Sequence, residues 1–362
     1  MSSTEDTSRS SPHFLHLLGS PAGGAGSPAN RKLVSSWLFL LAFMIWVMVG
    51  IGGYTRDTGS GLSIMHWEPL IGVWPPLSDA AWNRLFALYK TIPQYQILHQ
   101  NMGLDGFKQL FWPEYVHRCW GRLMGLVLLL PLIIFALTRR VEKRLIPWLF
   151  LLFLLGGLQG LVGWFMVSSG FRPGSIAVEG WRLSLHFFCA MFLFAAVLWT
   201  ALIVRFPKTQ PCKNLKGLRL HTLLAFILLL LAMWGGTMVS GIHGIADFSI
   251  ANNVGDGVPP PSWPMSGLLV SPAAIIFLHQ CLAVLATLAI LSLTVRALRM
   301  NLTGPVRDAA LLAGGVVLLQ FIFGVTALVS ARIDIGVIHQ MNAVLLMGSL
   351  LLMLFHLRGA RN

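Results

Sequence analysis

The main pattern along the chain is a series of long apolar segments separated by short polar connections. Each segment has about 20 residues, the length that an α-helix needs to cross the ~30 Å hydrocarbon core of a bilayer. The predicted fold class is therefore an all-α polytopic membrane protein. We expect about eight transmembrane helices, at residues 37–54, 116–137, 145–167, 181–204, 219–239, 271–295, 307–329 and 335–356.

The longest polar connection, residues 55–115, contains one further helical pattern. After Ser78, a suitable N-cap residue, apolar side chains recur at positions i, i+3, i+4 and i+7. This spacing predicts a short amphipathic helix, which we expect to lie over the mouth of the helix bundle. The residues on its apolar face are Trp82, Leu85, Phe86 and Tyr89.

Polar and small residues recur between the two halves of the chain at a nearly constant offset. The helix at 145–167 contains QGLVGWFMVSS, and the helix at 307–329 contains QFIFGVTALVS. The pattern predicts an internal repeat of two tandem four-helix bundles with the same orientation, since four crossings return the chain to its starting side. The matched pairs are Gln159 and Gln320, Gly163 and Gly324, Ser169 and Ser330, His117 and His279, and His186 and His339.

This repeat divides the chain into three regions. Residues 1–35 are expected to form a disordered cytoplasmic tail, because the first 30 are rich in Ser, Gly and Pro. They carry Glu5 and Asp6 and lack the apolar core of a signal peptide. Residues 36–205 form the N-terminal four-helix half with the long external loop 55–115, and residues 206–362 form the C-terminal four-helix half.

Composition and charge agree with a membrane protein and argue against binding to nucleic acid. The chain is 56% hydrophobic and only 11% charged, with a net charge of +13. Most Lys and Arg residues lie in the tail and in the short connections on one side, whereas the loop 241–270 has none. By the positive-inside rule, both termini are expected to be cytoplasmic. The four cysteines, Cys119, Cys189, Cys212 and Cys281, offer no pair in the external loops and hence no expected disulfide.

Four histidines share one depth in the predicted bundle. His117, His186, His279 and His339 each lie near the external start of an even-numbered helix. Ionisable side chains are costly at membrane depth, so they indicate function. A planar macrocycle needs two imidazoles that face each other across its iron, and neutral imidazole binds iron well. The layer therefore predicts two haem sites, each held by one histidine pair.

Two alternatives stay open for these histidines. Each could be a hydrogen-bonded packing residue, and a zinc site would use the same imidazoles but lacks nearby Cys or carboxylate partners at zinc-site spacing. Small residues beside the ligands leave room for a flat group, although they also suit close helix packing. These are Gly121, Gly125, Ala190 and Ala343.

Longer motifs give the chain a family resemblance that covers nearly all of it after the tail. They are GGYTRDTGSGLSIMHWEPLIGVWPPL at 52–77, FWPEYVHRCWGRLMG at 111–125, QGLVGWFMVSSG at 159–170, LHFFCA at 185–190, LHQ at 278–280 and IHQMN at 338–342. With these motifs the chain resembles the haem A synthase family. The absence of a cysteine pair from the external loops is similar to the branch shared by proteobacteria and mitochondria.

The resemblance implies an activity, a cofactor and a location. Family members oxidise a ring methyl group of haem O to a formyl group, which makes haem A for terminal oxidases. By the same resemblance, His117 and His186 would hold the substrate haem, and His279 and His339 would hold a haem b cofactor. The implied location is a bacterial inner membrane. Implied partners are haem O synthase, terminal oxidase assembly factors and membrane lipid, with a homo-oligomer as a candidate assembly.

Charged residues near the first histidine pair are candidates for further roles. Glu114 lies three residues before His117 on the same helix face, and we expect it to accept protons from the reacting group. The alternative is an acid placed only by the helix dipole. Arg56, Arg118 and Arg122 are candidate partners for haem propionates, or interfacial residues that snorkel.

The loop departs from the family pattern at two positions. His66 precedes Trp67 where relatives often have an acid, and Asp57 stands where an apolar residue is usual.

Two other functions fit the histidine layer equally well. They are a dihaem b-type electron-transfer protein and a non-enzymatic haem carrier.

Overall fold

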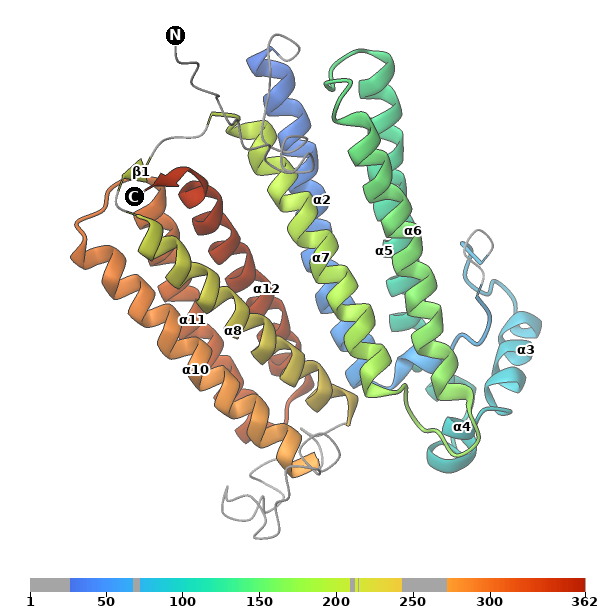
Figure 1. Cartoon of the computed structure of the whole chain (residues 1–362). Helices are drawn as coiled ribbons and strands as arrows, with labels where there is room; N and C mark the ends of the chain where they lie inside the picture. Colours follow the sequence, from blue (N-terminus) through green and yellow to red (C-terminus); the bar gives the residue numbers. More distant parts are fainter. Residues whose placement is uncertain (1–26, 68–71, 209–211, 214, 243–271, 362) are drawn as a thin grey trace, which may run out of the picture.

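The computed structural model describes residues 27–67, 72–208, 212–213, 215–242 and 272–361, and this part of the chain is almost entirely helical (Figure 1). Eight of its helices are long and apolar enough to cross a membrane. The chain is thus an all-α, multi-pass membrane protein, as its hydrophobic pattern predicts. The eight are α2 (Pro28–Asp57), α5 (Leu104–Leu137), α6 (Ile146–Val167), α7 (Gly180–Arg205), α8 (Lys216–Gly241), α10 (Pro272–Arg299), α11 (Pro305–Ser330) and α12 (Ile333–His356).

Most of these bounds match the predicted segments within a few residues, but α2 and α5 begin earlier. The Ser27 side chain caps α2 by accepting a hydrogen bond from the backbone N–H of Asn30 at 3.2 Å, and Pro28 occupies the first turn. Residues 28–35, which we expected to belong to a disordered tail, are therefore helical. Residues 1–26 of that tail lie outside the described part of the chain.

Helix α5 has 34 residues, or about 51 Å at 1.5 Å per residue, which exceeds the thickness of a bilayer core. Its first three turns pack outside the expected membrane span, where Phe107 and Phe111 are buried against aromatic residues of the loop. Hydropathy marks only the membrane-crossing part of such a helix. For this reason the sequence predicted a start near residue 116.

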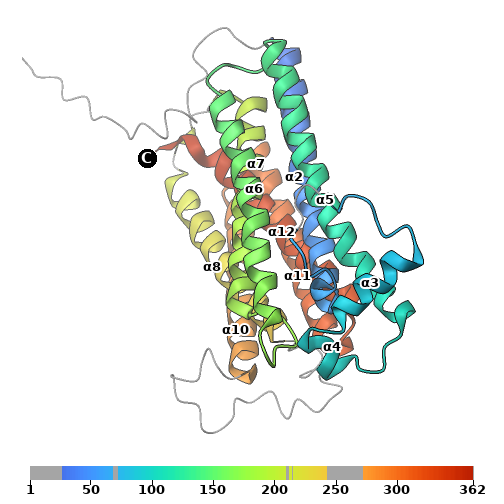
Figure 2. The ribbon, with the colours of Figure 1, turned by 90° about the vertical axis from the view of Figure 1, so that its right-hand side faces the viewer.

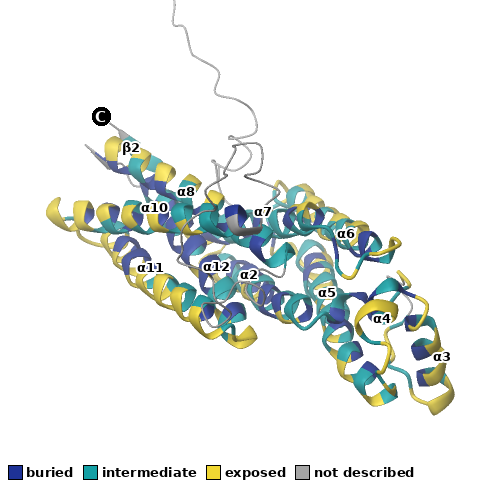
Figure 3. Ribbon diagram, turned by 90° about the horizontal axis from the view of Figure 1, so that it is seen from below, coloured by how far each residue is buried: buried dark blue, intermediate teal, exposed yellow. Residues whose placement is uncertain are grey.

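The loop 55–115 forms a small helical subdomain beside the start of α5 (Figure 2). The predicted amphipathic helix is confirmed as α3 (Asp79–Tyr89), and Ser78 caps it by accepting from the Ala81 N–H at 3.2 Å. Its predicted position is wrong. Helix α3 lies at the outer edge of the molecule beyond α5, not over the centre of the bundle (Figure 3). The other short elements are η1 (Ser60–Leu62), α4 (Pro93–Leu98), η2 (Ser168–Phe171), η5 (Leu357–Gly359), and the parallel pair β1 (Cys212–Lys213) and β2 (Ala360–Arg361).

Helices of both predicted halves meet in the middle of the molecule. Helix α2 packs against α7 and α12, and α8 packs against α7 and α12 as well (Figure 1). The Trp46 indole N–H in α2 donates to the Met341 carbonyl in α12 at 2.9 Å, and the Ser184 and Thr237 hydroxyls lie 2.7 Å apart between α7 and α8. One continuous apolar core therefore joins the two halves.

Exposed residues lie along the outer faces of α6, α10 and α11 (Figure 3). Many of these exposed side chains are large and apolar, which suits contact with lipid chains rather than with water. Examples are Leu151, Leu154, Leu158, Leu161, Leu285, Leu288, Leu312 and Leu319. The start of α2 and the C-terminal end of the chain lie at one end of the bundle, and α3 and α4 lie at the other (Figure 1).

A buried polar chain ties the subdomain to the end of α2. The Tyr89 hydroxyl, in a fully buried side chain, donates to Gln94 Oε1 at 2.9 Å, and Gln94 Nε2 donates to the Gly59 carbonyl at 3.0 Å. A hydroxyl has one proton, so His99 Nδ1 must carry its own proton and donate to the Tyr89 oxygen at 2.7 Å.

This arrangement predicts acid sensitivity of the subdomain. Burial lowers the pKa of His99, so the unfolded segment binds a proton more readily than the folded one. Stability is then fully present above about pH 6.5, the ordinary histidine pKa, and is lost as the pH falls below it. Amide hydrogen exchange of residues 79–107 should accelerate between pH 7.5 and 5.5, after correction for intrinsic rates. The variant His99→Gln should lose this dependence, and an unchanged dependence would contradict the assignment.

Candidate functional site

The four candidate histidines lie on α5, α7, α10 and α12, toward the end of the bundle that carries α3 and α4. His186, His279 and His339 each fall in the second turn of their helix or just beyond it, whereas His117 lies deeper in α5 because that helix begins outside the membrane span. All four are partly buried. The structure thus supports the predicted common layer.

His279 and His339 form one facing pair. Their ring centroids are 6.5 Å apart, with an angle of 85° between the ring planes. A metal with a bond of about 2 Å to each imidazole, and about 1 Å from each bonding nitrogen to its ring centre, would place the centroids roughly 6 Å apart. The separation of the ring centroids is therefore close to that expected for two imidazole ligands of one iron.

The protonation of His279 also suits metal ligation. Its Nδ1 lies 2.9 Å from the Ala232 carbonyl oxygen in α8. A carbonyl can only accept, so Nδ1 carries the proton and Nε2 keeps its lone pair for a metal. The approach is close because Gly235 and Gly236 lie beside the imidazole, where an added methyl group would come within 3.1 Å and 3.2 Å of His279 atoms.

The other pair, His117 and His186, lies close enough for the two side chains to interact electrostatically. The His117 ring packs on Gly52 of α2, where an added methyl carbon would lie 3.4 Å from its Nε2. Gly52 and Gly53 lie inside α2, which continues to Asp57. The Gly-Gly pairs provide a flat backbone surface for a histidine ring.

Glycines support His186 and His339 in the same way. A methyl carbon added at Gly163 would lie 2.9, 3.3 and 3.7 Å from Cε1, Nδ1 and Nε2 of His186. The same three distances separate a methyl carbon at Gly324 from the corresponding atoms of His339. The same glycine–histidine contact thus occurs at two positions that are paired in the sequence, while the repeat of whole bundles stays a prediction. The matched glycines were visible in the sequence, but their role depends on a contact between helices.

Two glutamines bind the same two histidines. Gln159 Nε2 lies 3.2 Å from His186 Nδ1 and donates to the His186 carbonyl at 2.8 Å. Gln320 Nε2 lies 3.2 Å from both ring nitrogens of His339. The sequence marked both glutamines as repeat positions without a function, and the structure places them as the polar partners of two candidate ligands.

Glu114 is buried beside the first pair, with 5% of its surface exposed. Its Oε1 accepts a hydrogen bond from Arg118 Nε at 2.6 Å. Arg118 also donates through Nη1 to the His66 carbonyl at 2.6 Å and through Nη2 to the Ile64 carbonyl at 2.7 Å. Arg118 thus holds both the carboxylate and the loop at residues 64–66 next to His117.

The three arginines proposed for haem propionates make different contacts. Arg118 is engaged as described, and Arg122 Nη1 lies 3.9 Å from the Cys119 sulfur. Arg56 Nη2 donates to the carbonyls of Ser240 and Gly241, at 2.8 and 3.1 Å, in the last turn of α8. A cation at this position satisfies carbonyls that lack helical partners and favours the negative end of the helix dipole. Arg56 therefore helps to join the two halves.

Sequence reasoning missed one buried cation near His186. Arg182 is 7% exposed, pairs with Glu179 at 2.9 Å and stacks on the Phe165 ring at 4.0 Å. It lies about one turn before His186 on α7. The spacing of Glu179 and Arg182 at a helix start was the available signal.

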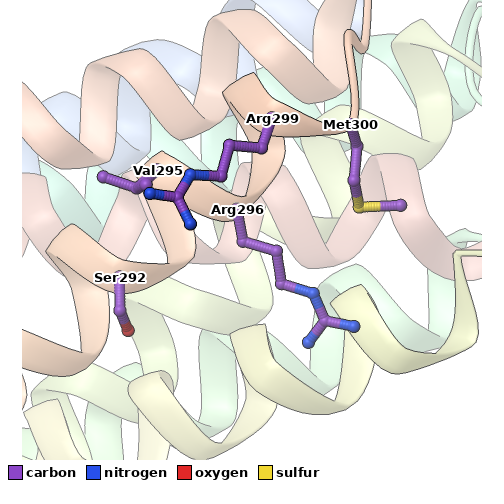
Figure 4. Close-up of a pocket in the computed structure, with 5 residues that line it drawn as sticks. All are labelled: Ser292, Val295, Arg296, Arg299 and Met300. Atoms are coloured by element: carbon purple, nitrogen blue, oxygen red, sulfur yellow. The ribbon is translucent and has the colours of Figure 1, made fainter.

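Within the described residues, no three His, Cys, Asp or Glu side chains lie together as a metal-binding group. The ring contact between His279 and His339 is a contact of two histidines, which suits a macrocyclic iron held by two imidazoles. A cavity of about 500 Å³ lies at the opposite end of α10 (Figure 4) and is no part of this layer. It is lined by Ser292, Val295, Arg296, Arg299 and Met300.

The chain is similar to known proteins over most of its length. Residues 35–351 match the COX15-CtaA family model, described as cytochrome oxidase assembly protein. The chain is 44% identical to "Heme A synthase 2" of Acidiphilium cryptum, over 92% of this chain and 94% of that protein. It is 45% identical to "Heme A synthase" of Granulibacter bethesdensis, over 91% and 89% of the two chains, and 39% identical to "Heme A synthase" of Rhodospirillum centenum, over 94% and 92%.

The family match extends over all eight membrane-spanning helices and all four histidines of the layer. Because both the model match and the relatives cover most of its length, the chain belongs to the COX15-CtaA family of cytochrome oxidase assembly proteins.

Proposed function

We propose that this protein is a haem A synthase, which oxidises a ring methyl group of haem O to a formyl group. The observation that carries the proposal is the set of paired histidines, with the ring centroids of His279 and His339 6.5 Å apart, a spacing that would suit two imidazole ligands of one iron. The relatives' name, heme A synthase, supports haem A as the product, since a histidine layer alone suits any dihaem protein. The product would serve terminal oxidases.

The two pairs are proposed to have different ligands. His117 and His186 would hold the substrate haem, because Glu114 lies on the helix of His117 and Arg118 joins it to the loop at residues 64–66. His279 and His339 would hold haem b, which when bound supplies one-electron redox chemistry. The protein contributes fixed imidazole orientations, through the Ala232 carbonyl in one case and the glycine contacts in all four.

Glu114 is the proposed proton acceptor. Conversion of a methyl to a formyl group releases several protons, and a carboxylate near the reacting edge can take them one at a time. The Arg118 guanidinium holds the carboxylate through Oε1 and fixes its direction relative to His117. Burial of the pair keeps bulk water from competing for the same position.

Arg182 is added to Arg56, Arg118 and Arg122 as a candidate for propionate binding.

The proposed setting is a bacterial inner membrane with both termini in the cytoplasm. The histidine layer would then lie near the external face, as would the subdomain of residues 55–115. Haem O synthase and oxidase assembly factors are the expected partners, through delivery of substrate and removal of product.

Asp57, which departs from the usual apolar residue, lies 3.4 Å from the Ser240 hydroxyl at the joint of the halves.

The activity is tested by co-expression with a haem O synthase in a host that makes no haem A. Extraction and chromatography of total haems should show haem A or its alcohol precursor only when this chain is present. Accumulation of haem O alone, with a folded and haem-loaded protein, would favour an electron-transfer protein or a carrier instead.

Glu114→Gln should retain both haems but lower turnover by about 10²-fold or more, the size typical of a lost general base. The amide keeps the shape and one hydrogen bond to Arg118 but cannot accept a proton. Haem content by pyridine haemochrome and product formation in the co-expression assay are the two measurements. Asp105→Asn, at an exposed ion pair of the same helix, is the control. Loss of haem together with activity would make Glu114 a structural residue.

The glycine contacts predict separate losses from the two sites. Gly324→Ala should force the His339 ring to shift and reduce haem b content by about tenfold, the usual effect of disturbing a metal ligand's support. Gly163→Ala should act on the other haem only. Gly160→Ala and Gly315→Ala, at positions with no atom within 4 Å of an added methyl group, are matched controls on the same two helices. Equal losses of both haems in either test variant would contradict the assignment of ligands.

A further inference from the structure

The two glutamines that contact the histidines are themselves held differently. Three residues after His339, the buried Asn342 donates through Nδ2 to Gln320 Oε1 at 2.7 Å and to the Val316 carbonyl at 3.1 Å. The Gln320 amide is thus fixed on its oxygen side by one residue of α12 and contacts the imidazole on its nitrogen side. Asn342, Gln320 and His339 form one connected polar chain.

The corresponding position after His186 is Cys189. A thiol is a weak hydrogen-bond donor and cannot replace the Asn amide. In the part of the chain that the structure describes, Gln159 Oε1 is buried and makes no hydrogen bond. Gln159 is anchored only through Nε2, which donates to the His186 carbonyl. Its amide oxygen therefore has nothing to hold it in one orientation.

The residues that surround a metal ligand set how firmly the ligand is held, and their loss commonly weakens metal binding by 10- to 100-fold. A glutamine fixed at both ends restricts the imidazole that it contacts more than a glutamine fixed at one end. The two sites have a histidine, a glutamine and a glycine at corresponding positions. They differ in the residue three positions after the histidine, which is Asn342 in one site and Cys189 in the other. This difference is a physical cause of unequal ligand retention.

We propose that Asn342 and Cys189 are positioning residues that set haem exchange: Asn342 makes the His339 site retain its haem, and Cys189 leaves the His186 site able to release its own. This inference rests on the proposed function, since it requires one haem at each histidine pair. It gives the chain a physical means to keep a cofactor and turn over a substrate within two similar sites.

The test is a reciprocal exchange in the full-length protein, purified in nanodiscs after co-expression with a haem O synthase. Haem release to excess apomyoglobin is followed over time, and the haems remaining are separated by chromatography. In the parent protein, haem b should leave more slowly than haem O or haem A. Asn342→Cys should accelerate release of haem b about tenfold and leave the other haem unchanged. Cys189→Asn should slow release of haem O and haem A, with a matching fall in turnover.

A control separates this role from general loosening of α12. Ser349→Cys places a thiol at another buried polar position of that helix, where the serine hydroxyl bonds only to the Leu346 carbonyl. Equal acceleration of both haems in Asn342→Cys, or the same effect in Ser349→Cys, would overturn the proposal. The low-spin EPR signal of haem b, which reports the orientation of its imidazoles, should change in Asn342→Cys and not in the control.

Further outcomes keep this inference testable and distinct from the proposed function. If Asn342→Cys does not accumulate, Cys189→Asn decides alone, and unchanged release from that variant refutes the proposal. If no haem A is formed by any variant, the proposed reaction fails, yet the effect of Asn342→Cys on haem b release is still measured. Haem A formation with identical release rates in all variants would refute only the role of Asn342 and Cys189.

Discussion

The close contact between histidine rings and glycine backbones is the constraint on which the layer depends. Four helices each bring an imidazole against a neighbouring helix, and the spaces at Gly163 and Gly324 leave no room for a methyl group. A side chain at these positions would push the ring away from its partner across the layer. The separation of 6.5 Å between His279 and His339 follows from this packing, because a ring held against glycine has little freedom to move toward or away from the iron position.

Polar partners then act on rings whose positions are already fixed. The Ala232 carbonyl selects the protonation state of His279, and the glutamines approach His186 and His339 from α6 and α11. Charged residues are used at the edges, where Arg118 holds Glu114 and Arg56 joins α2 to the last turn of α8. Apolar and glycine packing thus set the positions of the imidazole rings, and hydrogen bonds then set their protonation and orientation.

Periodicity and hydropathy predicted the eight spans well, because crossing a bilayer imposes a length and an apolar composition that a sequence must display. They failed for the outer turns of α5, where burial of Phe107 and Phe111 depends on a loop distant in sequence. They also placed α3 over the bundle, since an amphipathic pattern identifies an apolar face but not the surface that it covers. The four histidines were found from depth and repeat. The supporting roles of Asn342 and the glycines depend on contacts between helices, so a repeat or a spacing along the chain could mark their positions but not their roles.

Helix α5 runs without interruption from the aromatic subdomain to His117 and onward through the membrane span. A continuous helix is stiff over this length, so the subdomain and His117 move together rather than independently. A displacement of the subdomain would therefore also displace His117 and change its position relative to His186.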